Sequence, residues 1–209
     1  MSAAGLPFWE LPKTLWIHGE CVSINTDFRA GIRVRQMWWD PYFRERGDLF
    51  WRYAGQILCG EEAALVWDED AAVTLLWYLL DGRVPCSVIR RRLSQAASDD
   101  QTEAVVPCEE GLSYVWDMPL IAASFLQVYG ISLAREELHL WEFDALLAAL
   151  PDDCALCRTL RARGADLSQI ADDTLRAAAA AERIRARVPK DAALHEMCND
   201  LHICTVGEC

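Results

Sequence analysis

The chain has 209 residues, of which 53% are hydrophobic, and its 20 Lys+Arg against 32 Asp+Glu give a formal net charge of −12. The apolar content excludes an intrinsically disordered chain, because it is sufficient to build a core. The negative charge opposes general nucleic-acid binding, which requires clustered positive charge. The length suits one medium domain or two small ones.

The first ten residues lack both the positively charged and the apolar region of a signal peptide. No apolar run reaches the roughly 18–20 residues that a membrane-spanning helix needs. We therefore expect a soluble, cytosolic protein that binds neither membrane nor nucleic acid.

The first elements in chain order are a predicted β-hairpin and a helix. Two short extended runs, at residues 14–17 and 21–24, flank a turn that contains Gly19. Asn25, Thr26 and Asp27 then supply capping side chains, and a helix is expected to follow over residues 28–39. The Asp40-Pro41 step ends that helix, because a residue before proline disfavours helical backbone.

Apolar spacing predicts two further helices before the middle of the chain. One spans residues 48–59, and the other begins after Asp68 and ends near Leu80. Residues 83–113 contain two prolines and a run of small polar residues, so we predict a long connector there. Within it, Arg90–Arg92 are expected to form a short helical turn only.

The second half of the chain is predicted to be helical as well. The expected helices span residues 117–130, 132–150 (capped by Ser132), 153–163, 168–188 and 191–203. All twenty aromatic residues lie at or before Phe143, and the remainder is rich in Ala and Arg.

The predicted fold is therefore mainly α, with a small N-terminal β-hairpin and a C-terminal helical arm. We divide it into an N-terminal segment (1–26), an aromatic-rich core (27–151, interrupted by the connector at 83–113) and an Ala/Arg-rich arm with a cysteine-containing tail (152–209).

The predicted helix over 168–188 carries a seam of apolar and small residues. Its members recur at spacings of four and three: Ile170, Thr174, Ala177, Ala181, Ile184 and Val188. A seam of this kind is typical of a coiled-coil or partner-docking face. A helix that folds back onto the body of the protein has the same pattern, and the sequence favours neither.

Nine cysteines raise the question of a metal site. Cys154 and Cys157 have metal-ligand spacing, and the tail adds His195 and Cys198 as weak further zinc ligands. The alternative is that the first two simply pack one helical turn apart. Glu136 and His139 also form one Glu-x-x-His pair on a predicted helix face, whereas a di-iron bundle needs two. We expect neither cofactor nor catalysis.

Three sequence segments together resemble the bacteriophage gene-product-fifteen family, over roughly residues 14–188. The first is Asn25, Thr26, Asp27, Phe28 and Arg29 after the hairpin. The second is a Phe-Leu-Gln-Val-Tyr-Gly run that contains Phe125, Tyr129 and Gly130. The third follows Leu138 and contains His139, Trp141, Phe143 and Pro151.

The resemblance implies a tail assembly chaperone that acts in the host bacterial cytoplasm, and it brings no catalytic residues. Its implied partner is the phage tape measure protein, with the tail tube protein as a second candidate, and homo-oligomerisation stays open. Two other functions remain alternatives: a structural minor tail or connector component of the virion, and a zinc-binding regulatory protein.

A chaperone for a long helical chain must offer apolar surface while it stays dissolved itself. Trp38, Trp39 and Trp51 are our candidate anchors, together with the seam residues Ile170, Ala177, Ala181 and Ile184. For each single tryptophan, packing in the core is the alternative.

Overall fold

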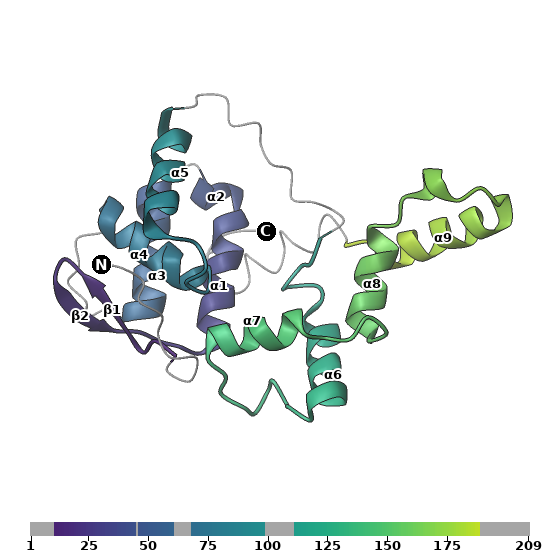
Figure 1. The fold of residues 1–209 in the computed structure, drawn as a ribbon, viewed down its shortest axis with the longest axis horizontal. Helices are drawn as coiled ribbons and strands as arrows, with labels where there is room; N and C mark the ends of the chain where they lie inside the picture. Colours follow the sequence, from purple (N-terminus) through teal and green to yellow (C-terminus); the bar gives the residue numbers. More distant parts are fainter. Residues whose placement is uncertain (1–10, 45, 61–67, 99–110, 189–209) are drawn as a thin grey trace, which may run out of the picture. The chain divides into compact units, whose positions relative to one another are not determined.

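A computed structural model describes residues 11–44, 46–60, 68–98 and 111–188 (Figure 1). The chain forms two compact units that interleave along the sequence. The first contains residues 1–104 and 136–148, and the second contains residues 105–135 and 149–209. The predicted division into three consecutive segments remains a prediction.

The first unit begins with the predicted hairpin. Strand β1 (Thr14–Ile17) pairs antiparallel with β2 (Glu20–Ser23), and β1 packs against helix α4. The turn residues His18 and Gly19 have φ values of 51° and 81°, as expected for a tight two-residue hairpin turn. Alternate residues of β1 are buried, so the hairpin presents one apolar face to the core.

The helices of the first unit are α1 (Phe28–Trp39), α2 (Pro41–Arg44), α3 (Gly47–Cys59), α4 (Glu69–Leu79), α5 (Cys86–Ser98) and α7 (Leu140–Ala148). The predictions of α1, α3 and α4 are confirmed. The Asp27 carboxylate accepts the Arg29 N–H, and the Asp68 carboxylate accepts the Ala71 N–H, so both caps form as expected. Helix α1 packs against α3 and α7 (Figure 1).

The connector predicted at residues 83–113 is wrong in its first part, because α5 is a full helix there. The turn expected at Arg90–Arg92 is the middle of this helix, and Ile89 is buried. Pro85 does not interrupt the helix, because its carbonyl accepts the N–H groups of Val88 and Ile89 at the helix start. Residues 99–110 of the connector lie outside the described residues.

The helix predicted from Ser132 is also wrong in its first half, because α7 begins only at Leu140. Residues 133–135 form a turn, and the residues just before α7 pair with the N-terminal end of α1. The N–H of Phe28 donates to the Leu138 carbonyl at 3.0 Å, and the N–H of Leu140 donates to the Thr26 carbonyl at 2.9 Å. Tertiary backbone pairing therefore takes the place of the expected helical turns.

The second unit contains α6 (Met118–Tyr129), α8 (Ala155–Arg163), a short 3₁₀ helix η1 (Leu167–Gln169) and α9 (Asp173–Ala186). Helices α6 and α8 match the predictions, and Gly130 ends α6 in the left-handed conformation with φ 70°. The single helix expected over 168–188 is wrong, because η1 and a break precede α9. The helix expected over 191–203 lies outside the described residues.

A buried ion pair links the helices of the second unit. The Arg163 guanidinium forms two hydrogen bonds to the Asp117 carboxylate, at 2.5 and 2.6 Å, and both side chains are almost completely buried. Arg163 also donates to the carbonyl oxygens of Gly111 and Ala186. One side chain thus connects the end of α8 with the start of α6 and the end of α9.

In the parts of the chain that the structure describes, no helix combines the length and the apolar character needed to cross a membrane.

Candidate functional site

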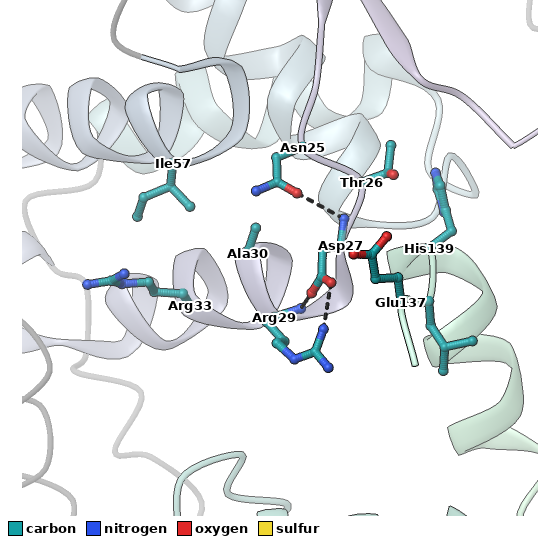
Figure 2. A pocket seen from close by; sticks show the side chains of 10 residues that line it. Asn25, Thr26, Asp27, Arg29, Ala30, Arg33, Ile57, Glu137 and His139 are labelled. Atoms are coloured by element: carbon teal, nitrogen blue, oxygen red, sulfur yellow. Dashed lines mark hydrogen bonds and ion pairs between the residues drawn. The ribbon is translucent and has the colours of Figure 1, made fainter. Parts of the chain in front are cut away.

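The segment from Asn25 to Arg29 forms the junction between the hairpin and three helices of the first unit. The backbone N–H of Asn25 donates to the Leu58 carbonyl at the end of α3, at 2.6 Å. The Asn25 side-chain oxygen accepts the N–H of Asp27 at 3.1 Å (Figure 2). This segment therefore leads into α1 with its polar groups already bonded locally.

Asp27 and Arg29 connect this junction to the segment before α7. The Asp27 carboxylate caps α1 and forms an ion pair of 2.6 Å with the Arg29 guanidinium (Figure 2). Arg29 also donates to the Glu136 carbonyl at 3.1 Å, and the backbones of Asp27 and His139 form an antiparallel bridge. Two of the segments that carry the family resemblance are thus neighbours in space.

His139 is held between two backbone groups in this bridge. Its Nδ1 accepts the N–H of Trp141 at 3.1 Å, and its Nε2 lies 2.9 Å from the Pro12 carbonyl. These contacts fit the neutral ring with its proton on Nε2, and burial lowers the pKa of His139. The prediction that Glu136 and His139 share a helix face is wrong, because both residues precede α7.

A pocket of about 770 Å³ lies at the junction (Figure 2). It is lined by Asn25, Thr26, Asp27, Arg29, Ala30, Arg33, Ile57, Glu137, Leu138 and His139. Four of these side chains, those of Asn25, Asp27, Arg29 and His139, use polar atoms in the bonds described above. These four residues, which belong to the segments of the family resemblance, therefore stabilise the fold of the first unit. Most of their polar groups already form hydrogen bonds or ion pairs within it.

A second feature of the first unit is a connected set of six rings on α1, α2 and α3, which we call the aromatic surface cluster. Its members are Trp38, Tyr42, Phe43, Phe50, Trp51 and Tyr53. The ring of Trp38 contacts those of Phe50 and Trp51 edge-on, with centroids 5.1 and 5.8 Å apart. Phe43 continues the set, with centroids 5.8 Å from Tyr53 and 5.2 Å from Tyr42.

This cluster has a buried base and an exposed rim. Phe43 and Phe50 are each 3% exposed, whereas Trp38 is 41% exposed and Tyr42 and Tyr53 are each 46% exposed. The sequence prediction named Trp38 and Trp51, which the structure brings together, and it missed the two tyrosines. Tyr42 lies on α2, a four-residue helix too short for an apolar period to reveal. The side chain of Trp39 lies outside the described residues.

The C-terminal seam is partly exposed in the second unit. Ile184 is 75% exposed and Ala177 is exposed, whereas Ala181 is half-buried. Ile170 follows η1 and does not belong to α9, so the seam is shorter than the sequence predicts. The role of these residues in partner binding remains a prediction.

Cys154 and Cys157 lie at the start of α8. Cys154 is the capping residue, and its sulfur accepts the N–H of Cys157 at 3.4 Å. Burial alone would raise the pKa of Cys154, but hydrogen bonding with Cys157 opposes it, and the net effect lowers that pKa. Among the residues that the structure describes, no three His, Cys, Asp or Glu side chains gather as metal ligands would. The other zinc candidates, His195 and Cys198, lie outside those residues.

Two carboxylates and an arginine form a half-buried cluster in the first unit. The Arg35 guanidinium forms two hydrogen bonds with Asp144, at 2.7 and 2.6 Å, and lies 3.4 Å from an Asp81 oxygen. Burial, a hydrogen bond with Asp144 and repulsion from its charge raise the pKa of Asp81 to about 7. Asp81 therefore holds its proton over a pH range in which an unfolded chain has released it.

We expect the substitution Asp81→Asn to stabilise the protein at neutral pH. Between pH 4 and pH 7 the unfolded chain loses the Asp81 proton and the folded chain keeps it, so the wild type loses stability as the pH rises. Asparagine cannot ionise, and it tolerates the positive φ of 57° at this position. Thermal unfolding should show a melting-temperature advantage for the variant that is close to zero at pH 4 and increases up to pH 7.5.

The control for this prediction is Glu20→Gln, which removes one negative charge from an exposed position on β2. An advantage that does not change with pH, or that Glu20→Gln reproduces, would contradict the assignment to Asp81.

A family model described as bacteriophage Gp15 protein matches residues 9–183. No curated protein and no solved structure matches the chain.

Proposed function

Because the chain belongs to the bacteriophage Gp15 protein family, we propose that it is a non-catalytic tail assembly chaperone that binds the tape measure protein in the host cytoplasm. The tail tube protein is the second candidate partner. Family membership indicates a phage structural or morphogenesis protein. The choice of a chaperone among such proteins depends on the surface of the first unit.

The aromatic surface cluster is the observation that carries this proposal. Exposed rings on a rigid helical base offer apolar contact area at a small cost in side-chain entropy. Tryptophan and tyrosine are also the residues that most often dominate binding energy at interfaces. The rim residues Trp38, Tyr42 and Tyr53 are exposed, so they could contact the apolar stripe of a helical partner.

The charge of the chain supports the same role. A net charge of −12 makes copies of the protein repel one another and favours solubility. A chaperone that covers an aggregation-prone helical chain in many copies needs both properties. The exposed rings then bind apolar partner surface without gathering copies of the protein itself.

The test is co-expression of the chain with fragments of the tape measure protein from the same phage. We expect the wild type to increase the soluble yield of a fragment and to elute with it in size-exclusion chromatography. The triple variant Trp38→Ser, Tyr42→Ser, Tyr53→Ser removes the rim and keeps the buried base, so it should lose both effects.

The matched control is Trp16→Ser with Leu126→Ser, which removes two exposed apolar side chains outside the cluster. Circular dichroism should show that both variants fold. The chaperone proposal fails if the wild type leaves fragment yield unchanged, or if the control variant loses as much as the rim variant. Stoichiometric amounts of the chain in purified virions, measured by mass spectrometry, would favour the structural tail component instead.

A further inference from the structure

The second unit contains a groove of about 730 Å³ between the start of α6, one face of α8 and the end of α9. We call it the arginine groove. All of its lining residues belong to the second unit, and four of them are arginines: Arg158, Arg161, Arg163 and Arg185. Among the described residues of this lining, Glu182 is the one acidic side chain. Such a concentration of guanidinium groups is unexpected in a chain with a net charge of −12.

Two of these arginines are already paired. Arg163 is buried and bonded to Asp117, and Arg161 donates to the Asp152 carbonyl at 3.0 Å. The other two, Arg158 and Arg185, are exposed and have no hydrogen-bond or ion-pair partner among the residues that the structure describes. They lie on different helices, α8 and α9, on the lining of one groove.

Apart from Thr159 and Glu182, the remainder of the groove lining is apolar and mostly small. Trp116 is 45% exposed there, and Leu120, Ala155, Ala162 and Ala186 are half-buried. Alanine side chains allow a second chain to approach the helices closely, and the exposed indole offers a flat apolar contact. The groove thus combines a largely apolar floor with two arginines that pair with none of the described residues.

We propose that the arginine groove binds an acidic peptide segment of a partner protein. Carboxylates of the segment pair with Arg158 and Arg185, and an apolar side chain of the segment packs against Trp116. Guanidinium groups match carboxylates in geometry and form paired hydrogen bonds with them. This proposal does not depend on the chaperone proposal, because it concerns the second unit and the aromatic surface cluster lies in the first.

The experiment uses the full chain and two fluorescein-labelled, alanine-based helical peptides. One peptide carries glutamate and leucine on one face, and the other carries lysine in place of glutamate. We expect saturable binding of the acidic peptide in fluorescence anisotropy, weakened by added salt, and weaker binding of the basic peptide by about tenfold or more.

The test variant is Arg158→Glu with Arg185→Glu, and the matched control is Arg91→Glu with Arg92→Glu on α5. The control makes the same charge change at two exposed arginines outside the groove. We expect the groove variant to lose about tenfold in affinity for the acidic peptide and the control to lose far less. Replacement of Trp116 by serine should also weaken binding.

Three results would overturn the proposal. The first is that the two peptides bind equally, or that neither binds saturably. The second is an equal loss of affinity in the groove and control variants. The third is a wild-type oligomer in light scattering that the groove variant converts to a monomer, because a second copy of this chain would then occupy the groove. Each readout is separate from the co-expression test of the chaperone proposal.

Discussion

Replacing Asp117 by alanine is expected to lower the free energy of unfolding by about 3–5 kcal/mol. Asp117 is fully buried, and its partner Arg163 has only 2% of its side chain exposed. Without the carboxylate, a guanidinium remains buried without a counter-charge, and the Ser113 N–H loses its acceptor as well. Because Arg163 connects α8 with the start of α6 and the end of α9, the loss of stability should affect the packing of all three helices.

Urea unfolding at neutral pH measures this effect. The matched control is Asp173→Ala, which breaks an exposed ion pair with Arg176 on α9 and should cost well under about 1 kcal/mol. The double replacement Asp117→Leu with Arg163→Met should recover part of the loss, because it leaves no unpaired charge. Equal losses for Asp117→Ala and Asp173→Ala would show that the buried pair contributes no more than the surface pair.

Replacing Phe143 by alanine is the second large effect that we expect, again about 3–5 kcal/mol of unfolding free energy. The rings of Phe28 and Phe143 are stacked, with centroids 4.6 Å apart and planes 12° apart. Both side chains are buried, so alanine leaves a cavity between α1 and α7. The same two residues belong to separate segments of the family resemblance.

The control for this prediction is Phe143→Leu, which keeps most of the volume and should cost less than the alanine variant. A double-mutant cycle with Phe28→Ala isolates the contact between the rings. The two single losses should add up to more than the loss in the double variant, because either replacement alone already removes the stacking. Additive losses would contradict a direct contribution of the stacked pair.

Local signals explain why several elements could be predicted from the sequence. Asp27 and Asp68 cap helices by hydrogen bonds to N–H groups two or three residues away, and Gly130 ends α6 by its own backbone conformation. Hydrogen bonds of this kind are encoded within one turn of chain. The amphipathic period of α3 is equally local, so its boundaries were predicted to within one residue.

The incorrect predictions depend on contacts between distant parts of the chain. Helix α7 begins only at Leu140 because residues 138–140 pair with residues 26–28, and no periodicity in the sequence indicates that pairing. Helix α5 was missed because Pro85 and small polar residues resemble a connector. Trp38 and Trp51 could be predicted as binding residues because tryptophan is common at interfaces. The arginine groove could not be predicted, because its lining comes from α6, α8 and α9, whose packing the sequence pattern does not indicate.

The bridge between Asp27 and His139 has a consequence for the order of folding during synthesis. The first unit needs α7, which the ribosome makes only after residues 105–135 of the second unit. The ring of Phe28 stacks on Phe143, and the Thr26 carbonyl accepts the N–H of Leu140. In each pair, more than a hundred residues are translated between the first partner and the second. A nascent chain that ends before Leu140 lacks α7, so the core of the first unit is complete only after part of the second unit has been synthesised.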